Sequence, residues 1–403
     1  MAVNYRFNNG GNAADFDDVF IRKDLFTQGG LWTWGRNSSG QLGDGSSIVH
    51  RSSPIQTISG GTNWKQVSSG SDYFSGIKTD GTLWMWGSNN AIAIANGQLG
   101  DNTIVHRSSP VQTVASGTNW KQVASGGWHS VAVKTDGTLW LWGANNISFG
   151  GTGQLGDNTI ANKSSPVQTI SAGSNWKQCF AGSNHTTAIK TDGTLWIWGG
   201  NSYGQLGVND ITHRSSPVQT ITGGTNWKQV AGGAYHTAAI KTDGTLWIWG
   251  MGTSGQLGDN TAVNKSSPVQ TVSSGTNWKQ LASGGGGPSF QAAIKTDGTL
   301  WLWGQNTQAQ LGDNTLVSKS SPVQTVAGGT NWKQVSSALY LTAAIKTDGT
   351  LWTWSANNIN GQIGDNTVVN KSSPVQTVAG GTNWKQVACG GNNGAAAIRE
   401  DYY

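Results

Sequence analysis

A Trp-x-Trp tripeptide recurs seven times along the chain, and this repeat constrains the fold more than any other feature. Consecutive copies are 51 to 56 residues apart, and 21 of the 22 Trp belong to the same repeated frame. The frame also contains Gly-Gln-Leu-Gly-Asp, Ser-Ser-Pro-Val-Gln-Thr, Asn-Trp-Lys-Gln and Lys-Thr-Asp-Gly-Thr-Leu elements, always in this order. Self-similarity at a fixed period indicates one supersecondary unit used many times. The copies are Trp32/Trp34, Trp84/Trp86, Trp140/Trp142, Trp196/Trp198, Trp247/Trp249, Trp301/Trp303 and Trp352/Trp354.

The fifth repeat shows most clearly that the unit is built from strands. Residues 237–242 and 245–249 are predicted to be two strands joined at Asp243-Gly244. An Asp-Gly pair between two such segments predicts a two-residue hairpin turn with positive φ at both turn positions. Residues 268–272 and 278–282 predict two further strands, with the proline at a strand start where no ladder donor is lost. Glycine makes up 59 of 403 residues and no segment has helical apolar spacing, so the chain is predicted to be all-β.

The Trp strand is apolar on both of its faces. Trp247 and Trp249 point to one side of the strand, while Leu246 and Ile248 point to the other. A strand buried on both sides suits a blade that lies between two neighbouring blades. Four antiparallel strands repeated seven times predict a seven-bladed β-propeller over residues 29–403, preceded by an N-terminal arm at residues 1–28.

Ring closure is predicted from the two ends of the repeat array. Residues 396–401 copy the Ala-Ala-Ile-Lys-Thr-Asp strand but have no Trp strand after them. The first Trp strand, residues 31–34, has no such strand before it. We therefore expect these two segments to pair, so that the C-terminal strand completes the first blade and removes an open edge.

Charge and cysteine usage narrow the class of partner. The net charge is +5, but 14 of the 25 Lys and Arg come from two frame positions, which predicts charge spread round the array and argues against a nucleic-acid partner. Cys179 and Cys389 belong to non-adjacent repeats, so free buried thiols are expected. No 18-residue apolar run exists and residues 1–28 lack the apolar core of a signal peptide, which predicts no membrane insertion and no usual export.

Three recurring motifs carry a resemblance to a known family. They are Gly-Gln-Leu-Gly, Leu-Trp-x-Trp-Gly and Gly-x-x-His-Thr, the last intact at residues 182–186 and 233–237. Together they resemble the regulator of chromosome condensation repeat family over residues 31–403, in a bacteriophage or bacterial member. The resemblance implies the propeller fold and non-catalytic binding of other proteins. Guanine-nucleotide exchange and UV-B photosensing also occur in the family, although only Gly127-Trp128-His129-Ser130 approaches the photoreceptor's Trp loops.

The loops that differ between repeats all fall on one predicted face of the disc, where a specific partner would bind. Insertions in repeats two and three are expected to present an apolar patch, unless they fold back over their own blades. Aromatic loop residues are expected to contribute to the same contact surface. His129, His185 and His236 are interpreted as structural hydrogen-bond donors or acceptors to a neighbouring loop. The predicted partner-binding residues are Ile92, Ile94, Ile147, Phe149, Tyr73, Phe74, Trp128, Tyr235, Phe290 and Tyr340.

Catalytic, cofactor and metal sites are not predicted. Twelve of the 20 acidic residues occupy two frame positions, no carboxylate pair departs from the frame, and Glu400 is the only Glu of the chain. Each Gly-Asp-Asn-Thr loop offers one carboxylate, which is too few for a calcium cage and is better explained by an Asp that closes its own turn. The sequence therefore predicts no enzyme, no cofactor and no metal centre.

The arm is apolar but too short for a core of its own, so we expect it to dock on a larger assembly. The arm, the near-identical repeats and the polar surface of the propeller together suggest a bacteriophage virion surface protein. Such a protein would decorate a capsid or tail or touch the host surface. The alternative is a cellular protein-binding propeller that acts as a regulator or inhibitor, with guanine-nucleotide exchange a weaker option. The docking residues are predicted to be Tyr5, Phe7, Phe16, Phe20, Leu25 and Phe26.

Overall fold

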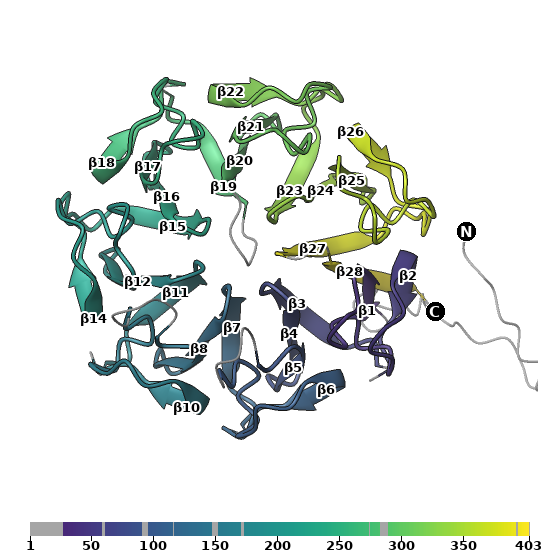
Figure 1. The fold of residues 1–403 in the computed structure, drawn as a ribbon, viewed down its shortest axis with the longest axis horizontal. Helices are drawn as coiled ribbons and strands as arrows, with labels where there is room; N and C mark the ends of the chain where they lie inside the picture. Colours follow the sequence, from purple (N-terminus) through teal and green to yellow (C-terminus); the bar gives the residue numbers. More distant parts are fainter. Residues whose placement is uncertain are drawn as a thin grey trace, which may run out of the picture.

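A computed structural model describes residues 27–58, 61–90, 96–115, 117–146, 152–170, 173–273, 275–282, 289–391 and 394–402. These ranges form seven four-stranded antiparallel sheets, which stand as blades in a ring around a central axis (Figure 1). They contain no helix, and therefore no helix that could cross a membrane. The predicted all-β, seven-bladed propeller is confirmed.

The strands of each blade follow one order from the axis outward (Figure 1). The innermost strands carry the Asn-Trp-Lys-Gln element and are β3 (Trp64–Ser69), β7 (Trp120–Ser125), β11 (Trp176–Ala181), β15 (Trp227–Gly232), β19 (Trp278–Leu281), β23 (Trp332–Ser337) and β27 (Trp384–Gly390). The second strands are β4 (Tyr73–Lys78), β8 (His129–Lys134), β12 (His185–Lys190), β16 (His236–Lys241), β20 (Phe290–Lys295), β24 (Thr342–Lys346) and β28 (Gly394–Tyr402).

The outer half of each blade holds the Trp strand and the Ser-Ser-Pro strand. The Trp strands are β1 (Thr27–Gly35), β5 (Leu83–Gly87), β9 (Leu139–Gly143), β13 (Leu195–Gly199), β17 (Leu246–Gly250), β21 (Leu300–Gly304) and β25 (Leu351–Ser355). The outermost strands are β2 (Arg51–Gln56), β6 (Arg107–Gln112), β10 (Lys163–Gln168), β14 (Arg214–Gln219), β18 (Lys265–Gln270), β22 (Lys319–Gln324) and β26 (Lys371–Gln376).

The ring closes through the two ends of the array, as predicted. In the closing blade the strand order is β2-β1-β28-β27, so β28 lies between the first Trp strand and the last inner strand. Leu31 pairs with Ile398 and Trp34 with Ala395 in an antiparallel register. Both strands are nine residues long, whereas the corresponding strands of the other blades have five or six.

The hairpin turn differs from the predicted type. Lys241 N–H donates to Thr245 O and Gly244 N–H to Lys241 O, each at 3.0 Å, so the loop has three residues. Of the Asp-Gly pair only Gly244 has a positive φ, at 80°. This is a turn followed by one left-handed glycine, and the two-residue prediction is wrong. The cause is the Asp243 carboxylate, which accepts hydrogen bonds from both the backbone and the hydroxyl of Thr245.

The proline position also differs. Strand β18 begins at Lys265, so Pro268 lies within the strand, where the pairing register with β17 shifts between Ile248 and Gly250. Because β18 is the outermost strand and is irregular there, the missing N–H of the proline does not interrupt the ladder.

The second Trp of each pair packs against the preceding blade. Trp249 is fully buried in one cluster with Ile197 and Leu206 of that blade. Its Nε1–H donates to the carbonyl of Gln205 at 2.9 Å. A Cβ on Gly207 would lie 2.6 Å from that nitrogen, which explains why Gly follows Gln-Leu. The first Trp, Trp247, is only partly buried.

Glutamine side chains of the innermost strands join neighbouring blades. Gln122 Nε2–H donates to Cys179 O, and Cys179 N–H donates to Gln122 Oε1, both at 3.1 Å. The same reciprocal contact links Gln386 to Val67 across the closing blade. These bonds hold adjacent inner strands side by side around the axis. Cys179 and Cys389 are buried free thiols, as expected.

Candidate interaction surfaces

Antiparallel strands send their connections alternately to two faces of the disc. In repeat five the Asp-Gly turn contacts the Asn-Trp connection that follows, because Trp278 N–H donates to Gly244 O at 3.1 Å. On the opposite side Met251 N–H donates to Tyr235 O at 2.8 Å, joining the Gly-x-x-His loop to the Trp-to-Gln-Leu-Gly connection. We call the first set, with 242–244 and 271–277 as its example, the turn face. The second set, with 233–235 and 251–264, is the variable face.

The three histidines of the Gly-x-x-His loops are buried between blades. His129 Nε2 lies 2.8 Å from Thr186 Oγ1, and His185 Nε2 lies 3.0 Å from Thr237 Oγ1. His236 Nε2 lies 3.2 Å from the Gln291 side-chain oxygen. Each contact reaches the next blade, so the structural interpretation is confirmed. Burial lowers the pKa of His129 and of His185 to about 3 and that of His236 to about 4, which keeps all three neutral near pH 7.

Three of the predicted contact aromatics belong to the core instead. Tyr73 and Phe290 begin β4 and β20, at the position that His129 holds in β8, and both are fully buried. Tyr73 Oη–H donates to His129 O at 2.6 Å. Phe74 is also buried and stacks on Trp86 with ring centroids 6.0 Å apart. These side chains are corrected from partner contacts to packing residues, because the strand starts one or two residues earlier than the loop assignment assumed.

The remaining described aromatics are half-buried on the variable face. Trp128, Tyr235 and Tyr340 lie in the Gly-x-x-His loops with part of each side chain accessible. Tyr203, which sequence reasoning missed, lies with its ring centroid 5.0 Å from that of Tyr235. Tyr203 occupies the position that Ser254 holds in repeat five. This departure from the repeated frame could have identified Tyr203 as a candidate contact residue from the sequence. The two tyrosines bridge the loops of neighbouring blades.

The other predicted contact residues are not part of the described structure. Residues 91–95 and 147–151 of the two insertions and residues 1–26 of the arm fall outside it, whereas Thr27 and Gln28 begin β1. Their predicted roles stay predictions for Ile92, Ile94, Ile147, Phe149, Tyr5, Phe7, Phe16, Phe20, Leu25 and Phe26.

The aspartates of the Gly-Asp-Asn-Thr loops are held within their own repeats. Asp101 accepts hydrogen bonds from Asn89, from the backbone and hydroxyl of Thr103, and from Arg107. Burial opposes ionisation, yet the bonds from Thr103 and Arg107 hold the pKa of Asp101 below its usual value. The described residues contain no group of three or more His, Cys, Asp or Glu arranged to hold a metal ion.

Comparison with known proteins places this geometry in a family. The model described as RCC1-like domain matches residues 25–315, and that of the regulator of chromosome condensation (RCC1) repeat matches residues 297–345. The Ultraviolet-B receptor UVR8 of Arabidopsis thaliana is 30% identical over 346 residues, which cover 85% of this chain and 76% of that protein.

Solved structures agree with this assignment at the level of the fold. Yeast RCC1 (Prp20), solved bound to Kap60, superposes with a TM-score of 0.80 at 17% identity and covers 100% of this chain and 97% of that one. Prp20p from Saccharomyces cerevisiae superposes with a TM-score of 0.79 at 19% identity and covers 94% of each chain. The chain belongs to the RCC1-like domain family.

Proposed function

We propose that the chain is a non-catalytic, protein-binding propeller that contacts its partner with the variable face. The observation that supports this most directly is the half-exposed pair Tyr203 and Tyr235, which lies across two neighbouring blades. Amphipathic aromatics are enriched where proteins meet and supply much of the binding energy. Solved relatives are described with protein partners, namely Kap60, Gsp1p and histones.

The chemistry of the described residues supports a role without catalysis. The loop aspartates are engaged by a serine or threonine and by an arginine or lysine of their own repeats, and the three neutral histidines are enclosed between blades. Burial raises the pKa of the Cys389 thiol to about 12 and that of Cys179 beyond it, so neither supplies a thiolate nucleophile. The propeller would therefore act by occupying its partner's surface, as a regulator or inhibitor.

A photo-crosslinking experiment tests the assignment of this face. We expect benzoylphenylalanine at Trp128, Tyr235 or Tyr340 to crosslink to one partner protein in the organism that makes the chain. The same probe at Gln270, an exposed position of the outermost strand β18, should not. The double variant Tyr203→Ser and Tyr235→Asn should weaken binding of that partner about tenfold or more, with an unchanged urea midpoint, because both side chains are accessible. Crosslinks from Gln270 alone, or equal binding by the variant, would contradict the proposal.

The finer hypothesis of a bacteriophage virion protein, made in the host cytoplasm and fixed to a capsid or tail through residues 1–28, rests on sequence alone. The cellular relatives support the alternative of a cellular regulator or inhibitor better. Mass spectrometry of purified virions distinguishes the two. Stoichiometric presence of the chain supports the virion assignment, and its absence from virions that the producing cells release rejects it.

A further inference from the structure

The charged side chains of the propeller differ between its two faces. On the variable-face side, each cation before Ser-Ser-Pro forms an ion pair with the loop Asp of its own repeat, so these charges cancel. Arg36 lies 3.9 Å from Asp72 in the same region. The pairs are Arg51–Asp44, Arg107–Asp101, Lys163–Asp157, Arg214–Asp210, Lys265–Asp259, Lys319–Asp313 and Lys371–Asp365.

The turn face carries a second set of seven cations, which we call the lysine ring. Each member follows the Trp that begins an innermost strand, and every one is exposed. Because the innermost strands surround the axis (Figure 1) and their glutamines join neighbours, these lysines encircle the axis on the turn face. Within the described ranges only Lys385 has an ion-pair partner, Glu400 at 2.9 Å. The ring consists of Lys65, Lys121, Lys177, Lys228, Lys279, Lys333 and Lys385.

A ring of carboxylates surrounds the lysine ring at a larger radius. These carboxylates belong to the Asp-Gly turns, which connect the second strand of a blade to the third. Hydrogen bonds from the hydroxyl and backbone of Thr245 hold the pKa of Asp243 below its usual value, and Thr82 does the same for Asp80. They are therefore ionised at neutral pH. Its members are Asp80, Asp136, Asp192, Asp243, Asp297 and Asp348.

The aromatic rings of the turn face are already covered by cations of the chain. Lys241 Nζ lies 4.9 Å from the ring centroid of Trp227 and 4.6 Å from that of Trp247. Lys78 and Lys134 lie over the equivalent Trp pairs of their repeats. These Trp faces are consequently not open for stacking by bases.

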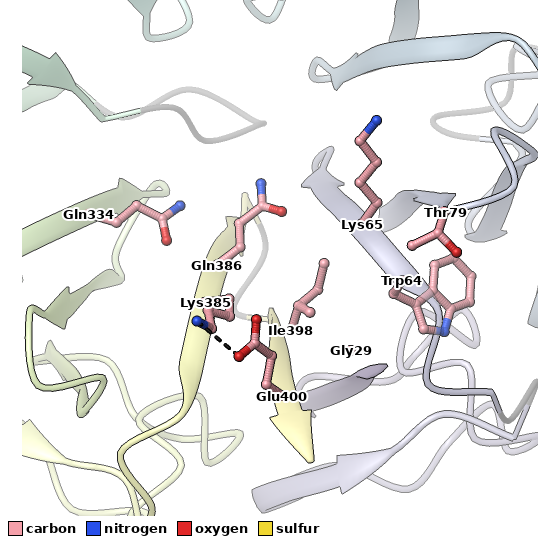
Figure 2. A pocket seen from close by; sticks show the side chains of 9 residues that line it. All are labelled: Gly29, Trp64, Lys65, Thr79, Gln334, Lys385, Gln386, Ile398 and Glu400. Atoms are coloured by element: carbon pink, nitrogen blue, oxygen red, sulfur yellow. Dashed lines mark ion pairs between the residues drawn. The ribbon is translucent and has the colours of Figure 1, made fainter. Parts of the chain in front are cut away.

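A pocket of about 500 Å³ opens beside the lysine ring at the closing blade. Figure 2 shows Lys65 and Lys385 on opposite sides of it, with Lys385 turned toward Glu400, Ile398 between the two lysines and Trp64 on the Lys65 side. Glu400 stands at the position where other repeats carry Thr, such as Thr242. One ring lysine is thus already held by a carboxylate of the chain itself.

We infer that the lysine ring binds a short acidic peptide segment, rich in Asp or Glu, that a partner protein lays across the centre of the turn face. The compact cluster of cations attracts carboxylates at its centre. A nucleic-acid duplex lying across the disc would extend over the outer carboxylates, whose charges are balanced by the lysines of the same turns, and would gain no further attraction there. Single-stranded nucleic acid would lack the aromatic faces on which bases stack. This surface lies opposite the variable face and adds a second contact to the proposed function.

Fluorescence anisotropy with a fluorescein-labelled octaglutamate peptide and the full chain tests the inference. We expect binding that weakens at least about tenfold between about 50 mM and about 300 mM NaCl. The variant Lys121→Gln, Lys228→Gln and Lys333→Gln should lose at least about tenfold in affinity. The matched variant Lys163→Gln, Lys265→Gln and Lys319→Gln has the same net charge but lies on the variable-face side, and should stay within about twofold of the wild type.

A gain of affinity provides a test that misfolding cannot imitate. Glu400→Thr restores the residue of the other repeats and releases Lys385, so the peptide should bind about two- to fivefold tighter. Undetectable binding by the wild type, or equal loss in the two triple variants, would overturn the inference. So would tighter binding of DNA oligonucleotides of equal charge. Crosslinks from the variable face would persist in each of these cases, which separates this failure from failure of the proposed function.

Discussion

Deletion of residues 394–403 should leave a chain that aggregates or unfolds instead of a monomeric propeller. The deletion removes β28, which pairs with both β1 and β27. It exposes the edges of those two strands and removes Ala395, Ala396, Ala397 and Ile398 from the core. Unpaired edges are templates for intermolecular pairing. Size-exclusion chromatography with light scattering, together with thermal unfolding followed by circular dichroism, measures the effect.

Two control variants test whether loss of ring closure causes the aggregation or unfolding of the truncated chain. Deletion of residues 401–403 alone keeps Gly394 to Glu400 in place and should leave a monomer. A circular permutant in which residues 394–401 precede residues 29–391 creates an Asp401-Gly29 turn, at the register where Arg399 already pairs with Gly30. This copies the hairpin of the other blades and should fold cooperatively. A stable monomer after the full deletion, or an aggregating permutant, would contradict the closure mechanism.

The repeat made the strands and their closure predictable, because the strand that the first repeat lacks is the strand left over after the last repeat. The turn type was not predictable from Asp-Gly alone, since the Asp243 side chain binds Thr245 and selects a longer loop. Contact residues were harder to predict because neighbouring positions differ completely in exposure. Trp128 is partly accessible, while His129, one residue later, is fully enclosed.

The lysine ring shows a different limit of sequence reasoning. Lys65 and Lys121 are a whole repeat apart, so along the chain the charge looked evenly spread. The distance of a cation from the axis of the disc determines which carboxylates lie near it. That distance is visible only in the assembled ring. The cations before Ser-Ser-Pro lie at the outermost strands and are paired with carboxylates, whereas those after Asn-Trp lie near the axis, where Lys385 alone has an ion-pair partner among the described residues. The charge is spread round the array as expected, and what the structure adds is its radial separation.

The free energy of unfolding should fall by about 6 kcal/mol between about pH 7 and about pH 5. The unfolded chain protonates its histidines near pH 6.5, whereas the folded chain takes up these protons only near pH 3 for His129 and His185 and near pH 4 for His236. Below pH 6.5 the unfolded state therefore binds more protons, and stability decreases as the pH falls. Each histidine contributes about 2 kcal/mol over this interval.

Urea unfolding followed by Trp fluorescence at several pH values measures this slope. His236→Phe, which installs the residue that Phe290 supplies in the next repeat, should remove about one third of the loss. The pKa of Asp243 and that of Asp101 are lowered in the folded chain, so these carboxylates titrate below the interval from pH 7 to pH 5. A flat profile from pH 7 to pH 5 would mean that the three imidazoles are not enclosed as neutral groups between the blades.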